Sequence, residues 1–237
     1  MGSIDDLLAV QVLDTRIDQL RHQRATMAQR AALVAATAEE LRGRSAVDEC
    51  AGRLKALRRS QKEAEDHASL LEDKAKGVNT ALYDGSITSH KELESLQTEH
   101  RQLKEHQSQC EDQAIEFMEL AEPVEAELAG YTIVVDDLVA LQSSLQAEIL
   151  VAETEIDVQI ADRAQERSSA VAGVPDDVVT LYDGLRKQQG GVAVARLTGA
   201  RCEGCHLEIP SAELEAIRRA PADTAVTCPD CGRLLVR

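Results

Sequence analysis

The sequence predicts a mainly α protein: a long antiparallel coiled-coil helical hairpin followed by a small C-terminal zinc ribbon of α+β character. Three observations lead to this fold class. Apolar residues recur at alternating spacings of three and four over two long segments, which is typical of coiled coils. A short turn-forming segment separates them, and two Cys-x-x-Cys pairs lie near the C-terminus. We expect residues 1–173 to form the hairpin and residues 174–237 to form the ribbon domain with a leading helix.

Composition supports a thin helical structure over a thick globular core. The 237 residues include no Trp, one Phe and three Tyr, although large aromatic side chains dominate compact cores. The formal net charge is −16, of which −15 lies on residues 1–173, so the hairpin should repel nucleic acid. No apolar run is long enough to span a membrane, and the N-terminus resembles no export signal, so we expect a cytoplasmic protein.

The first arm contains two heptad runs in different phases. The later run extends from Val47 to Leu82. The phase should slip near Gly43, which would locally change the winding of the coiled coil. The earlier run comprises Ile17, Leu20, Arg24, Met27, Ala31, Val34, Ala38 and Leu41.

The second arm keeps one phase from Leu93 to Ile156, and the turn before it should span about residues 83–89. Asp84-Gly85 is a turn signal, and Ser89 followed by Glu92 forms a capping box, so the second helix should begin at about residue 90. If the turn is centred at residue 86, position i of the first arm should lie opposite roughly position 172−i of the second arm. Pro123 should kink the second arm.

The remaining residues predict short elements. Helices are expected over residues 176–188 and 211–219, after a hinge near Gly173. Strands are expected over residues 192–198, 224–227 and 234–236.

Four cysteines predict one structural zinc ion: Cys202, Cys205, Cys228 and Cys231. Each Cys-x-x-Cys turn presents two thiolates along one edge of the tetrahedron that Zn²⁺ prefers. Gly204 and Gly232 should supply the unusual backbone angles of the two turns. Because all four positions are filled, no coordination site remains for a catalytic water.

Other interpretations of these cysteines are weaker. Cys202-Glu-Gly-Cys-His206 also matches a haem c attachment pattern, but that needs export and leaves the second pair unused. A redox pair would expect a βαβ context, and disulfides are unusual in a cytoplasmic chain. His206 should be exposed or should support the thiolates. Cys50 and Cys110 should be buried seam residues too distant for a disulfide.

At this point the chain resembles the bacterial C4-type zinc ribbon proteins, once called a domain of unknown function. The segment from Leu82-Tyr-Asp-Gly-Ser to Leu96-Gln97 resembles the family's hairpin turn, and Cys202-Glu-Gly-Cys-His and Cys228-Pro-Asp-Cys-Gly resemble its ribbon. The resemblance implies a hairpin joined to a zinc ribbon. It also implies adaptor roles in some relatives, which bind flagellar or type III secretion components and sigma factor-54, and messenger RNA binding in one kind.

Two functional interpretations remain. The first is a non-enzymatic zinc-binding scaffold or adaptor that mediates protein–protein interactions through its coiled coil and ribbon. The alternative is a nucleic-acid-binding regulator, with RNA or DNA held at the ribbon by Arg218, Arg219 and Arg233. The ribbon lacks aromatic side chains for base stacking, which favours the first. The sequence shows no catalytic constellation, so we expect no small-molecule substrate. Without a long apolar run, we also expect no membrane partner.

Overall fold

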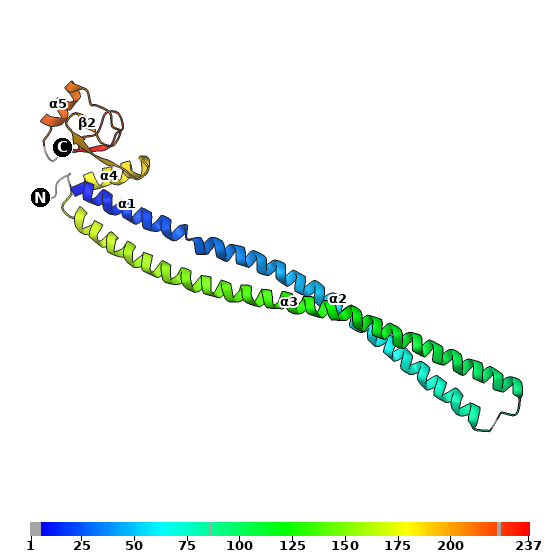
Figure 1. The fold of residues 1–237 in the computed structure, drawn as a ribbon. Helices are drawn as coiled ribbons and strands as arrows, with labels where there is room; N and C mark the ends of the chain where they lie inside the picture. Colours follow the sequence, from blue (N-terminus) through cyan, green and yellow to red (C-terminus); the bar gives the residue numbers. More distant parts are fainter. Residues whose placement is uncertain (1–5, 86, 222–223) are drawn as a thin grey trace. The chain divides into compact units, whose positions relative to one another are not determined.

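A computed structural model describes residues 6–85, 87–221 and 224–237. Most of the described chain is helical (Figure 1). Its elements in chain order are α1 (Asp6–Ala25), α2 (Ala28–Tyr83), α3 (His90–Val171), α4 (Asp176–Gln188), β1 (Val194–Thr198), β2 (Arg201–Cys202), α5 (Ser211–Arg219) and β3 (Leu234–Val236).

The contacts divide the chain into two compact units. One contains Ala32–Ser144, and the other joins the residues up to Ala31 with Leu145–Arg237. The predicted boundary between a hairpin at 1–173 and a ribbon at 174–237 stays a prediction. None of the helices in the described part of the chain combines the length and apolar character needed to cross a membrane.

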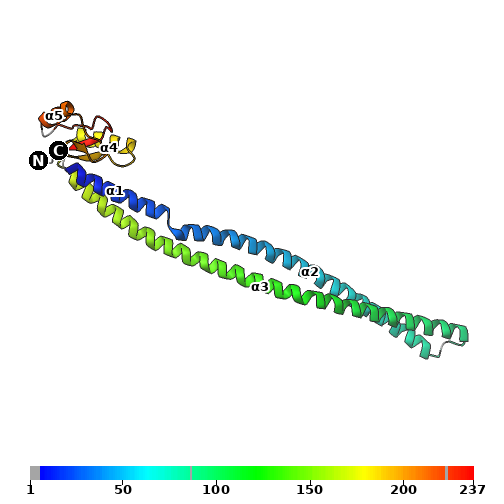
Figure 2. The same ribbon diagram turned by 45° about the horizontal axis from the view of Figure 1, so that its top comes forward.

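The unit of residues 32–144 is an antiparallel helical hairpin, as the heptads predict. α2 and α3 lie side by side along it (Figures 1 and 2). α2 ends at Tyr83 and α3 begins at His90, which confirms the predicted turn. The amide of Leu93 donates to the carbonyl of Ser89 at 3.1 Å, so Ser89 occupies the N-cap position. α3 continues through Pro123 without interruption.

Small residues fill much of the hairpin seam. The buried seam residues include Cys50 and five alanines, which are Ala36, Ala64, Ala68, Ala114 and Ala121. At Gly43 the helices approach so closely that an added Cβ would lie 2.8 Å from Cγ2 of Val135. Small seam residues therefore set a short distance between the two helices.

The phase slip in the first arm lies elsewhere than predicted. The helix breaks at Thr26–Met27, between α1 and α2, and α2 is continuous through Gly43. The break puts Leu33 and Ala36 on the seam and leaves Val34 and Leu41 about 70% exposed, at 71% and 68%. The prediction for these two residues was wrong because close approach of the helices favours the register that places small residues inside.

The pairing register was also wrong by about one and a half helical turns. Centring the turn at residue 86 assigns Ala129 to Gly43 and Glu122 to Cys50. In the structure Gly43 faces Val135, and the Sγ atom of Cys50 lies 3.8 Å from Oε2 of Glu127. The turn signal shows where the helices end, whereas side-chain packing along the seam fixes their register.

In the second unit, α1 pairs with the end of α3, and other elements cover both faces of a small sheet. The sheet order is β2-β1-β3, with β1 antiparallel to β2 and parallel to β3. β2 was not predicted, and the strand expected at 224–227 is reduced to a single bridge between Thr227 and Leu234. The helices α4 and α5 match their predicted bounds.

Alternation along β3 divides the hydrophobic core of this unit in two. Leu234 and Val236 contact one cluster, which contains Leu7 and Val10 of α1 and Tyr182 of α4. Leu235 points into the other cluster, which also contains Ile209, Leu214, Ile217, Cys202 and Cys228. One face of the sheet is therefore covered by α1 and α4, and the other by α5 and the cysteines.

Candidate metal centre

The four predicted cysteines converge on one point. Their sulfur atoms all lie within 4.8 Å of one another, and Cys202 and Cys228 are fully buried. The sulfurs of Cys202 and Cys231 are 3.9 Å apart, and those of Cys205 and Cys228 are 3.8 Å apart. A tetrahedral Zn²⁺ with Zn–S bonds of about 2.3 Å needs sulfurs about 3.8 Å apart. The donor set and its spacing therefore fit one zinc ion.

Two matching turns build the centre. The amide of His206 donates to the carbonyl of Cys202 at 2.7 Å, and the amide of Gly232 donates to the carbonyl of Cys228 at 2.9 Å. Both donors have a positive φ, 62° for His206 and 71° for Gly232. Each turn thus closes with a left-handed residue directly after its second cysteine.

The predicted role of Gly204 needs correction. Gly204 does not have a positive φ, and exposed His206 takes that conformation in the first turn. A Cβ at Gly204 would lie 2.8 Å from Cδ of Arg233 and 2.9 Å from Cβ of Ala195. Gly204 is thus required for space, because the first turn packs closely on β1 and on the second turn.

The thiols have unequal proton affinities. Burial raises the pKa of the Cys202 thiol, and it raises the pKa of Cys228 to about 12. Burial acts in the same direction on Cys231, but hydrogen bonds from the backbone and side chain of Arg233 outweigh it and lower that pKa to about 7. Buried thiolates at Cys202 and Cys228 therefore need a bound cation to stabilise their charge.

The three arginines predicted as a partner contact are engaged in separate interactions. Arg218 donates to the carbonyl of Gly199 at 3.0 Å, and Arg219 pairs with Glu215 on the preceding turn of α5. Arg233 donates to the carbonyl of Val192 at 3.0 Å. Their role in binding a partner stays a prediction.

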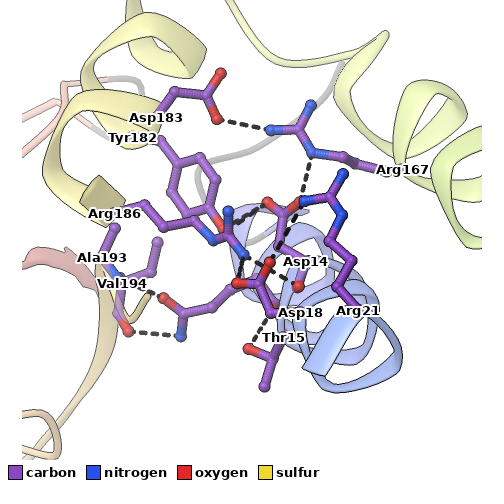
Figure 3. A network of polar contacts seen from close by, with 11 residues as sticks. Asp14, Thr15, Asp18, Arg21, Arg167, Tyr182, Asp183, Arg186, Ala193 and Val194 are labelled. Atoms are coloured by element: carbon purple, nitrogen blue, oxygen red, sulfur yellow. Dashed lines mark hydrogen bonds and ion pairs between the residues drawn. The ribbon is translucent and has the colours of Figure 1, made fainter. Parts of the chain in front are cut away.

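A polar junction that the sequence analysis missed joins α1 to the ribbon (Figure 3). Its centre is Asp14, the one buried charged residue of the described chain, at 5% exposure. Asp14 accepts hydrogen bonds from Nε of Arg167 at 2.8 Å and from the hydroxyl of Tyr182 at 2.9 Å. Arg186 donates to the backbone carbonyl of Asp14 at 3.0 Å and pairs with Asp18.

Gln11 extends this junction to the sheet. Its side-chain carbonyl accepts the amides of Ala193 and Val194, both at 2.7 Å, and its amide donates to the carbonyl of Val194 at 3.0 Å. β2 pairs only with Leu197 and Thr198, so it does not reach this end of β1. The side chain of Gln11 satisfies backbone groups that a neighbouring strand would otherwise satisfy.

Comparison with known proteins agrees with this architecture. The model of the CT398-like coiled coil hairpin domain matches residues 10–190, and that of the C4-type zinc ribbon domain matches residues 201–235. The chain belongs to the CT398-like coiled-coil hairpin family. The part matched by the C4-type zinc ribbon domain contains the four cysteines, which lie close together as one structural Zn²⁺ requires.

Individual proteins resemble this chain over nearly its whole length. An uncharacterized protein of Mycobacterium tuberculosis, Rv2229c, is 29% identical over 98% of this chain and 94% of its own length. A solved structure from Mycobacterium smegmatis has 26% identity and a TM-score of 0.68, with both chains fully covered. CT398 from Chlamydia trachomatis has 18% identity and a TM-score of 0.69, over 98% of this chain and 95% of that one, which shows the shared fold.

Proposed function

We propose that this chain is a non-enzymatic zinc-binding adaptor that holds protein partners through its hairpin and ribbon, in the cytoplasm. The observation that carries the proposal is the chemistry of the metal centre. Four thiols surround one point, so a bound zinc ion would have no free position for substrate or water. The ion would cross-link the two turns and fix the ribbon surface.

The helical arms favour a protein partner over nucleic acid. No Lys or Arg occurs between Lys104 and Arg163 of α3, whereas this stretch contains fifteen acidic residues. A phosphate backbone would be repelled along it. The family membership supports a hairpin and a ribbon as its two working parts.

The alternative function is nucleic-acid binding by the ribbon through Arg218, Arg219 and Arg233. All three guanidinium groups already donate to groups of the ribbon itself. A phosphate would have to compete with those acceptors, which makes this alternative the weaker one.

Capture from native lysate tests the choice. The full zinc-loaded chain is used as bait, with and without nuclease, and the retained material is analysed for protein and for nucleic acid. The proposal expects proteins that remain after nuclease treatment. A matched bait with Arg218→Ala and Arg219→Ala should retain the same proteins, with its zinc content checked to show an intact ribbon.

The contrary result is equally definite. Nucleic acid bound at submicromolar affinity, weakening steeply between about 50 and 200 mM salt and lost in the double variant, would replace the adaptor proposal by the alternative.

A further inference from the structure

The side chain of Arg233 lies against both cysteine turns. It is half-buried and directly follows the second turn in the sequence. Its Nη1 donates to the carbonyl of Gly204 in the first turn at 3.4 Å, and its Nε donates to the carbonyl of Val192 ahead of β1 at 3.0 Å. One guanidinium group therefore connects the two turns with the segment that leads into the sheet.

The first turn is shaped around this side chain. A Cβ added at Gly204 would lie 2.8 Å from Cδ and 3.5 Å from Nε of Arg233, and 2.9 Å from Cβ of Ala195. Gly204 does not have a positive φ, so its backbone conformation does not require glycine. The missing side chain of Gly204 instead makes room for the arginine between the two cysteines of the first turn.

The main chain of Arg233 supports the same centre. Its carbonyl accepts the amide of Cys228 at 2.8 Å. Backbone and side-chain hydrogen bonds from Arg233 also lower the pKa of the Cys231 thiol to about 7, against the effect of burial. Hydrogen bonds of this kind stabilise the charged form of a sulfur, which is the form that binds a metal.

Arg233 differs in these contacts from the two arginines of α5. Arg218 and Arg219 are exposed, and their partners Gly199 and Glu215 lie outside the cysteine turns. A zinc ion with four thiolates carries a net charge of about −2, which a nearby cation would offset. A guanidinium group suits this position because it is always charged and offers several donors in a rigid fork.

We propose that Arg233 is a positioning residue of the zinc centre, which holds the two cysteine turns in the geometry that binds the ion and so determines how tightly the chain retains zinc. Residues that support metal ligands in this way are worth about 10- to 100-fold in metal affinity. The proposal assigns Arg233 to the metal centre instead of a partner surface. It does not depend on which partner the hairpin holds.

Competition with a chromophoric chelator tests the proposal on the full chain. The measurement is made at one fixed pH, because apparent zinc affinity depends strongly on pH. Arg233→Met keeps a long apolar side chain and removes the guanidinium group, and it should lower zinc affinity about 10- to 100-fold. Arg218→Met is the matched control, because it removes the same charge from an exposed site of the ribbon, and it should change the affinity less than about twofold.

Cobalt substitution separates support of the ligands from a general weakening of the ribbon. Co²⁺ occupies tetrahedral thiolate sites, and its sulfur-to-metal charge-transfer band reports directly on the thiolates. In Co²⁺-saturated Arg233→Met this band should shift to longer wavelength, because sulfur electrons that lose hydrogen bonds are transferred at lower energy.

Gln189→Ala is the comparison for this shift. Gln189 donates to the backbone carbonyl of Cys231 at 2.9 Å, so it supports the same turn through the main chain. Its loss should lower zinc affinity only about fivefold, as expected for one neutral hydrogen bond, and should leave the charge-transfer band in place.

Helical content and hydrogen exchange of β3 in the metal-saturated proteins show whether each ribbon is folded. If Arg233→Met does not fold, Arg233→Lys takes its place, because it keeps the charge and loses the fork, and it should change affinity and band position in the same directions. Zinc affinity within about twofold of the wild type would overturn the proposal. An equal loss in Arg218→Met would also overturn it, since overall charge would then govern the affinity. So would a fall in affinity without a band shift, because Arg233 would then act through ribbon stability alone.

Discussion

Removing the carboxylate of Asp14 should loosen the junction between α1, α4 and the sheet. In Asp14→Ala, the charge-assisted hydrogen bond from Arg167 at 2.8 Å and the hydroxyl bond from Tyr182 at 2.9 Å are both lost. Breaking a buried ion pair costs about 3–5 kcal/mol when the remaining charge has no other partner. Here Arg167 keeps Asp183 and Arg186 keeps Asp18, so the lower end, about 3 kcal/mol, is expected.

Native-state hydrogen exchange is the suitable assay, because it reports each element separately. A loss of about 3 kcal/mol should speed exchange of α1 and α4 amides by roughly 150-fold. Amides of α2 and α3 within residues 32–144 should change little. Tyr182→Phe is the graded control, because it removes one hydrogen bond and should speed exchange only about fivefold.

The comparison between the two variants decides whether the carboxylate matters. If Asp14→Ala changed exchange no more than Tyr182→Phe, apolar burial in the cluster around Leu7 and Val10 would suffice to hold the junction. The reasoning from the buried charge would then be refuted.

Three further outcomes follow from the structure. Cys228→Ser should lower the zinc content from one ion per chain to none and expose α5 and β3 to exchange while the hairpin stays protected; metal analysis showing retained zinc would contradict this. Burial and the nearby Asp14 carboxylate raise the pKa of Tyr182, so its neutral form stabilises the fold below pH about 10, and that stability is lost as pH rises further; ultraviolet titration should show one tyrosine that ionises only on alkaline unfolding, and Tyr182→Phe should remove that step. Gly52→Ala should stabilise the hairpin by about 0.5–1 kcal/mol, because nothing lies within 4 Å of the new Cβ. Gly43→Ala should forfeit that gain through its 2.8 Å contact with Val135; equal thermal shifts for the two glycines would show that the helices separate freely.

The local elements were largely predictable because their signals are local. A proline directly before each helix and acidic residues in its first turn indicated where α4 and α5 begin. The turn before His90 followed from Asp-Gly and the capping residues. The cysteine spacing likewise identified the metal centre without any knowledge of the fold, because two Cys-x-x-Cys turns suffice to supply a tetrahedron.

Where two local arrangements were both compatible with the sequence, nearby residues did not show which one forms. The expected phase of α2, with Val34 and Leu41, is the more apolar, and the phase that includes Glu40 and Gly43 lies on the seam because the helices approach closely there. The exchange of roles between Gly204 and His206 has the same origin, since the space beside Gly204 is taken by Arg233 and Ala195. In each case a neighbour distant in sequence decides.

By itself, then, the sequence determined the hairpin, its turn, the ribbon helices and the four cysteines, because each depends on residues within a few turns of chain. The tertiary structure alone decided the pairing register, the exposure of Val34 and Leu41, and the junction at Gln11 and Asp14. The buried carboxylate of Asp14 is stabilised by Arg167 and Tyr182, which lie more than 150 residues away in the sequence. No local pattern encodes such a contact, because the free energy of burying a charge depends on which partners the fold brings to it.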